Sequence, residues 1–123
     1  MERVRFITHL GKKVLLIDYS NLTDESEIMQ MIEQREFIVD SQPRNSVLTV
    51  INVTGAKFTK EVLTRAKEAN VYDRPFVRRA AMVGVSENQK AAVDAVSMFA
   101  KREWGMFETV DQALDWIVNE EAA

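Results

Sequence analysis

Three short runs of aliphatic and β-branched residues alternate with segments of helical periodicity, and this alternation constrains the fold most. The runs cover residues 14–17, 47–53 and 79–85. Each precedes a stretch whose apolar residues recur every three or four positions, which is typical of an amphipathic helix. A continuous apolar run predicts a strand buried on both faces, and strands that alternate with helices form parallel sheets. The sequence therefore predicts an α/β domain.

One strand is expected before these units and a short one after them. Residues 3–8 alternate as a half-exposed strand does, and Gly11 with Lys12 leaves room only for a tight turn before the next strand. That connection makes the first two strands antiparallel. A short strand around Met106 and Phe107 precedes the last helix. We therefore expect one domain over residues 1–123, with a leading antiparallel strand, four βα units and a mixed, mostly parallel sheet on which the helices pack.

Polar residues mark the expected helix starts. Thr23, Thr59, Ser86 and Thr109 stand where an N-cap side chain accepts a hydrogen bond from a free backbone amide. Ser86 and Thr109 also have the capping-box spacing, with a glutamine three residues later. The side chains expected on the buried helix faces are Ile28, Met31, Ile32, Ile38, Val39, Val62, Leu63, Ala66, Ala69, Ala92, Val93, Val96, Phe99, Val110, Ala113, Trp116 and Ile117.

Few residue types that carry chemistry are present. The absence of cysteine excludes disulfides, thiolate metal sites and a cysteine nucleophile, and His9 is the single histidine. His9 is a candidate base or pH switch, but a hairpin position with no partner in sequence favours a structural residue. Residues 55–60 lack the second glycine and the Gly-Lys-Thr or Gly-Lys-Ser ending of a phosphate loop. We expect no metal, no cofactor and no enzymatic activity.

Charge and hydropathy bear on location and partners. The net charge is −3 and the pI about 5.2, which makes nucleic acid an unlikely partner. No apolar stretch is longer than the four residues 14–17, which is too short for a signal-peptide core or a transmembrane segment, so a cytoplasmic location is expected. At the C-terminal end, Glu120 and Glu121 are expected to extend into solvent.

The whole chain resembles the SpoIIAA-like, or STAS, fold, and specifically the bacterial branch of STAS/SEC14 domain proteins. The resemblance is carried by residues 79–84 (RAAMVG), 106–109 (MFET) and 112–117 (QALDWI). It implies a regulatory protein similar to the anti-sigma factor antagonists, which act through protein contacts. Their phosphorylatable serine, at the helix after the central strand, falls near Thr59. The Asp-Ser-Ser-Gly-like motif around that serine is absent from this chain.

Four residues are candidates for a ligand site or a phosphorylation switch. Open α/β sheets bind ligands beyond the carboxyl ends of their strands, and Asp18, Thr54, Thr59 and Ser86 are predicted to share that edge. Thr59 is the candidate phosphate acceptor, although a helix cap explains a hydroxyl there more simply. Asp18 is a candidate to orient a substrate, with a loop hydrogen bond as the simpler interpretation.

Two further patterns leave the function open. Residues 57–79 carry a net charge of +4 and residues 18–40 a net charge of −6, which suits a homodimer, a charged partner, or simply solvated helix faces. The methionines and aromatic residues either fill the core or line a pocket, so the alternative to a protein-interaction domain is a module that binds an apolar small molecule or lipid. The candidate pocket residues are Met29, Met31, Met82, Met98, Met106, Phe99, Phe107, Trp104 and Trp116.

Overall fold

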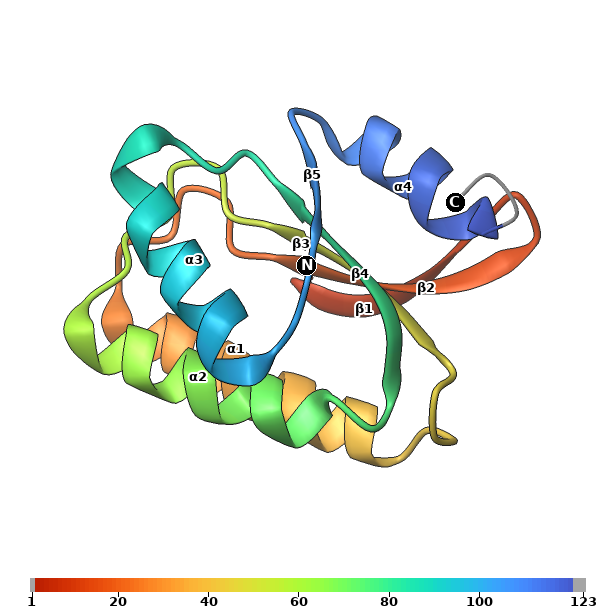
Figure 1. Cartoon of the computed structure of the whole chain (residues 1–123), viewed down its shortest axis with the longest axis horizontal. Coiled ribbons are helices and arrows are strands. Elements are labelled where there is room, and N and C mark those ends of the chain that lie inside the picture. The colour runs from red at the N-terminus through yellow and green to blue at the C-terminus, as the bar shows by residue number, and fades with distance from the viewer. Residues whose placement is uncertain (1, 121–123) are drawn as a thin grey trace.

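Five strands form one sheet, with four helices packed on it (Figure 1). The computed structural model describes residues 2–120, and Glu121 lies outside this range. The elements in chain order are β1 (Val4–His9), β2 (Lys12–Asp18), α1 (Glu25–Asp40), β3 (Val47–Asn52), α2 (Lys60–Asp73), β4 (Val77–Val83), α3 (Glu87–Ala100), β5 (Gly105–Phe107) and α4 (Val110–Val118).

The sheet has the predicted mixed topology, and its strand order is β1-β2-β3-β4-β5. Strands β1 and β2 are antiparallel, whereas β2, β3, β4 and β5 are parallel to one another. The hairpin turn consists of Leu10 and Gly11, both at positive φ (49° and 81°), and His9 pairs with Lys12. Two positive φ angles suit the right-handed twist of a two-residue hairpin. The turn thus lies one residue earlier than predicted.

The helices cover the two faces of the sheet unequally. Helices α1, α2 and α3 lie on one face and α4 on the other (Figure 1). Along β2, Leu15 and Ile17 join the core under α1–α3, while Val14 and Leu16 join the core under α4. Residues 14–17 form a continuous apolar run because both faces of this strand are buried. Each such side chain contributes about 1.5–3 kcal/mol on burial.

Three of the four predicted helix caps are correct. Thr59 accepts from the Val62 amide (3.2 Å), and Thr109 from the Gln112 amide (3.2 Å). Ser86 is the N-cap of α3, where its own amide donates to the Gln89 side chain (2.9 Å).

The fourth predicted cap, Thr23 for α1, is wrong. Asp24 caps α1 and accepts from the amides of Ser26 (2.8 Å) and Glu27 (3.2 Å). Its carboxylate satisfies two amides and also lies at the positive end of the helix dipole.

The buried helix faces differ from the prediction at several positions. Phe99 is 59% exposed, because the buried stripe of α3 runs through Gln89, Val93, Val96 and Ala100. The remaining differences concern side chains that are only partly buried, namely Ile38, Leu63, Ala66, Ala92, Val110 and Trp116.

The C-terminal end of the described chain is also held more closely than expected. The Glu120 carboxylate lies 2.6 Å from Arg78 Nε and 3.7 Å from Lys12 Nζ. Its side chain is 24% exposed, so Glu120 does not extend freely into solvent. The two cations on β4 and β2 attract the carboxylate back to the sheet, and the expectation made for Glu121 stays outside the described residues.

Candidate functional site

The loops at the carboxyl edge of the sheet are tied to one another by short contacts. Asp18 ends β2, and its carboxylate accepts from the Ser20 amide (3.0 Å) and lies 3.9 Å from Arg3 Nη1. The backbone of the same loop continues across to the next strand, where the Asn21 amide donates to the Thr54 carbonyl (2.7 Å). Asp18 therefore closes a loop with a local hydrogen bond.

Thr54 is held at the centre of this edge. Its amide (3.1 Å) and its hydroxyl (2.7 Å) both donate to the Asn52 side-chain oxygen. Gly84, at the end of β4, packs directly on Thr54: a Cβ added to Gly84 would lie 1.9 Å from Thr54 Oγ1. Since Gly84 also has a φ of +78°, a side chain is disfavoured there for two reasons.

Thr59 lies at a different place, between the starts of two helices. Besides capping α2, its hydroxyl donates to the Glu25 carboxylate in the first turn of α1. Ser86 begins α3. Among the side chains of residues 2–120, no hydrogen bond joins any two of Asp18, Thr54, Thr59 and Ser86. The structure therefore distributes the four candidates along the loops instead of converging them on one point.

His9 has a partner that the sequence does not reveal. It is the last residue of β1, and its Nε2 lies 2.7 Å from a carboxylate oxygen of Asp115 on α4. The two residues are 106 positions apart in the chain, so only the fold brings them together. This contact fastens α4 to the hairpin.

A buried polar cluster between α1 and α2 was not predicted. Arg35 is 5% exposed, and its guanidinium donates to the Asp73 carboxylate (2.6 Å) and to the Asn70 side-chain oxygen (3.0 Å). The Asn70 amide donates in turn to the Ala66 carbonyl (2.8 Å). The signal available in the sequence was the position of Arg35, three residues after Ile32 on the buried stripe of α1.

Burial sets the protonation behaviour of this cluster. It raises the pKa of Asp73 above its ordinary value, although Arg35 opposes the shift. For Arg35, burial alone would lower the pKa, but the carboxylate of Asp73 and the phenol of Tyr19 outweigh it and raise the pKa. Burial also raises the pKa of Tyr19, so its phenol remains protonated and available as a hydrogen-bond donor near neutral pH.

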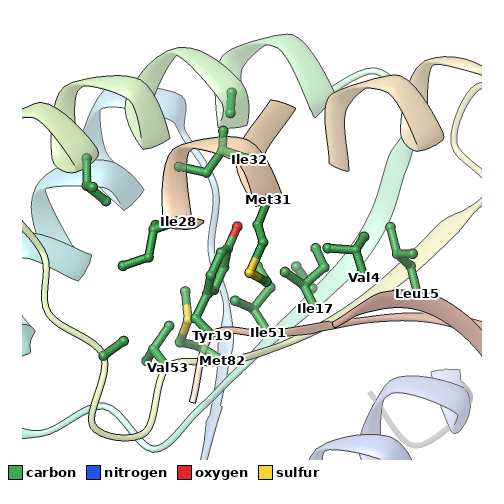
Figure 2. Packing of buried hydrophobic residues seen from close by; sticks show 14 of the residues in the cluster. Val4, Leu15, Ile17, Tyr19, Ile28, Met31, Ile32, Ile51, Val53 and Met82 are labelled. Atoms are coloured by element: carbon green, nitrogen blue, oxygen red, sulfur yellow. The ribbon is translucent and has the colours of Figure 1, made fainter. Parts of the chain in front are cut away.

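A partly open cavity of about 60 Å³ adjoins the cluster, between the sheet and α1, α2 and α3. Its walls are mostly aliphatic, with Tyr19, Arg35, Asn70 and Trp104 as the polar contributions. Figure 2 shows the Tyr19 hydroxyl directed from the sheet toward the helix layer. Within the described chain, the buried Tyr19 hydroxyl and the buried Trp104 Nε1 have no hydrogen-bond partner. Two residues that line the cavity thus carry buried donors for which the described chain offers no acceptor.

The methionines and aromatic residues do not gather around one pocket. Met82 and Trp104 line the cavity. Met98, Phe99 and Met106 are 81%, 59% and 52% exposed. The remaining predicted members belong to the two cores, with Met29 and Met31 under α1–α3, and Phe107 and Trp116 under α4. The cavity is therefore lined chiefly by residues other than those predicted.

Two searches over residues 2–120 bear on the expected chemistry. Among these residues, no three histidine, aspartate or glutamate side chains lie close enough together to hold a metal ion. Over the same range, no helix has the length and apolar character needed to cross a membrane.

Comparison with known proteins identifies the fold. No protein-family model and no curated protein matches the chain. Among solved structures, it is similar to an uncharacterized protein of the DUF3478 family from Shewanella loihica PV-4, which has a SpoIIAA-like fold. The TM-score is 0.73 at 17% sequence identity, and the match covers 93% of this chain and 91% of the other. The predicted SpoIIAA-like fold is therefore confirmed.

Proposed function

We propose that this SpoIIAA-like chain is a non-enzymatic regulatory domain that acts through contacts with a protein partner, either a different protein or a second copy of itself. The observation that carries the proposal is the fold, which extends over nearly all of the chain. It is supported by the hydrogen bonds that hold Asp18 and Thr54 within their own loops. A catalytic carboxylate or hydroxyl would instead be directed at a common point where a substrate can bind.

Thr59 is the residue we propose as a phosphorylation switch. Its hydroxyl links the starts of α1 and α2 through Glu25. A phosphate group on Thr59 would be favoured by the free amides at the start of α2 but repelled by the Glu25 carboxylate. Phosphorylation would therefore break the Thr59–Glu25 contact and alter the surface formed by the two helix starts, without disturbing the core.

The substitution Thr59→Glu tests this switch. We expect it to change the affinity for the physiological partner while the protein stays folded. Cross-linking in the native cell recovers that partner, and the affinity is then measured by reversible binding to it. Thr23→Glu is the matched control, because Thr23 is exposed, lies near the start of α1 and caps no helix. Equal effects of the two substitutions, or an intact mass that shows no phosphate in the native cell, would rule out the switch.

The second candidate function is a module that binds an apolar small molecule or lipid, and the observation that favours it is the cavity beside Tyr19. Its volume of about 60 Å³ favours a compact molecule over a long acyl chain, which would require α1–α3 to move away from the sheet. Thermal denaturation with candidate compounds tests this function. If neither compact apolar molecules nor fatty acids raise the melting temperature, the cavity serves only as packing.

A further inference from the structure

We propose that the cavity under α1–α3 binds a compact, uncharged molecule that carries a hydrogen-bond-accepting oxygen, such as a small ketone. This proposal rests on the second candidate function and adds the chemistry of the ligand. The juxtaposition behind it is an apolar cavity lined by two residues that each carry a buried donor without an acceptor, Tyr19 OH and Trp104 Nε1.

The polar groups define what the ligand must offer. Tyr19 is 5% exposed, and no acceptor among residues 2–120 takes the proton of its hydroxyl, although the Arg35 guanidinium lies close enough to its oxygen to affect its pKa. An indole N–H can only donate, so Trp104 requires an acceptor atom. Buried donors are almost always satisfied in folded proteins, by protein groups, by water or by a ligand. An oxygen atom with free lone pairs is therefore the complement to this wall.

The charges around the cavity favour an uncharged ligand. Arg35 is the charged residue on the wall, and its guanidinium already donates to Asp73 and Asn70. An ionised ligand would lose its hydration and would meet an arginine whose charge is already compensated. A neutral carbonyl loses much less on leaving water and can still accept from Tyr19 or Trp104.

Volume limits the size of the ligand. A water molecule occupies about 10–15 Å³ when cavities are measured in this way. The cavity of about 60 Å³ therefore corresponds to about four to six water-sized positions. The remaining wall is formed by aliphatic side chains such as Ile28, Ile51 and Val93. A small ring or branched carbon skeleton fits these walls better than a row of waters, since most of those waters would lack polar partners.

A route to the cavity lies on the side of α2 and α3. Four lining residues there, Phe58, Leu63, Ala66 and Ala92, are only partly buried, whereas lining residues from the sheet such as Ile51 and Met82 are fully buried. Helices α2 and α3 are neighbours, so a ligand that enters between them leaves the strands of the sheet in place.

The experiment compares three probes in titrations followed by amide and indole nuclear magnetic resonance. The probes are cyclopentanone, methylenecyclopentane, which has the same shape but a carbon in place of the oxygen, and butanoate, which carries a charge. We expect cyclopentanone to bind more tightly than butanoate and to shift the indole N–H signal of Trp104 by accepting its hydrogen bond, which methylenecyclopentane cannot do. The indole signal of Trp116, a residue of α4 on the other face of the sheet, is the internal control and should not move.

Two variants connect binding to the named groups. Tyr19→Phe removes only the hydroxyl, and Trp104→Phe removes the indole N–H. Tyr19→Phe is expected to weaken cyclopentanone binding about fivefold, the effect of one hydrogen bond, and to leave methylenecyclopentane unchanged. Trp104→Phe also removes part of the apolar lining, so it should weaken both probes, and cyclopentanone more than methylenecyclopentane. Trp116→Phe is the matched control and should alter neither affinity.

The outcomes separate this proposal from the function on which it rests. If Tyr19→Phe weakens cyclopentanone binding no more than methylenecyclopentane binding, or butanoate binds best, the proposed ligand chemistry is wrong while a small-molecule module remains. If none of the probes shifts the Trp104 signal or any amide lining the cavity, both proposals fail.

Discussion

At the scale of single residues, the largest expected effect on stability comes from the Arg35–Asp73 ion pair. The side chains of both residues are almost completely buried, at 6% and 2% exposure. Arg35→Met would leave the Asp73 carboxylate buried without its partner, so the free energy of unfolding should fall by about 3–5 kcal/mol. Chemical denaturation measures this change.

Another ion pair between the same two helices provides the control. Arg65 on α2 pairs with Glu36 on α1, but the side chains are 26% and 21% exposed. Arg65→Met should therefore cost only about 0–1 kcal/mol. Equal losses in the two variants would show that burial does not determine the strength of the Arg35–Asp73 pair.

Ionisation of the Tyr19 phenol makes the free energy of unfolding depend on pH in the alkaline range. Burial raises the pKa of its phenol above 10.0, so in the unfolded chain the phenol loses its proton at a lower pH than in the folded chain. The unfolded state then binds fewer protons, and stability falls as the pH rises above 10, by up to about 1.4 kcal/mol per pH unit. Below pH 10 this contribution is fully present.

An ultraviolet titration of Tyr72→Phe measures the effect, because Tyr19 is then the one tyrosine left. We expect its phenol to ionise above pH 10 and together with unfolding. Ionisation near pH 10 in a protein that remains folded would contradict the burial of this hydroxyl.

The sequence shows where Arg35 lies but not what it does there. Its spacing from Ile32 and Val39 places it on the buried stripe of α1, as helical periodicity predicts. Its partner Asp73 is 38 residues away at the end of α2, and no local pattern relates the two. For the same reason, no local pattern in the sequence predicts the contact between His9 and Asp115. Such pairs follow from the packing of elements, which a single sequence does not specify.

At the scale of elements, the contact of the β4–α3 loop with Thr54 is the most constrained feature. Gly84→Ala would introduce a Cβ at a positive φ and against Thr54. The left-handed backbone costs about 1–2 kcal/mol, and the overlap adds about 1–3 kcal/mol. Gly11→Ala is the control, because Gly11 has a similar φ of +81° and no atom within 4 Å of the added Cβ.

Thermal or chemical denaturation of the two variants separates backbone strain from contact. The Gly11 variant should show the backbone cost alone, and the Gly84 variant a clearly larger loss. Comparable losses would indicate that the loops at the carboxyl edge move apart easily, which would contradict the tight edge described for Thr54.

Elements were predictable where local chemistry determines them. The run 14–17, the hydroxyl caps Thr59 and Thr109, and the short strand at Met106 follow from burial pattern and hydrogen-bonding capacity. The cap of α1 was predicted one residue too early because Thr23 and Asp24 are adjacent and both able to cap.

The exposed Phe99 was missed because hydrophobicity alone does not tell which of several apolar residues faces the sheet. In the structure, Phe99 lies beside α2, with the Lys67 amine 5.7 Å from its ring centre.

For the whole molecule, the two faces of the sheet differ in character. The face under α4 is closed by Trp116, which packs on Phe107 (5.3 Å between ring centres) and under the Arg79 guanidinium (3.9 Å from the ring). The face under α1–α3 contains the cavity, the buried ion pair and the unsatisfied hydroxyl of Tyr19. Mixed topology and family resemblance were visible in the sequence, whereas the cavity depends on how three helices meet the sheet.

This asymmetry underlies our proposal that the cavity under α1–α3 binds a small molecule. A crystal structure of the protein grown with cyclopentanone tests it most directly. We predict density for the ketone in the cavity, with its oxygen within hydrogen-bonding distance of Tyr19 OH or Trp104 Nε1. A cavity that contains only ordered water, or ketone bound elsewhere with the cavity unchanged, would contradict the claim.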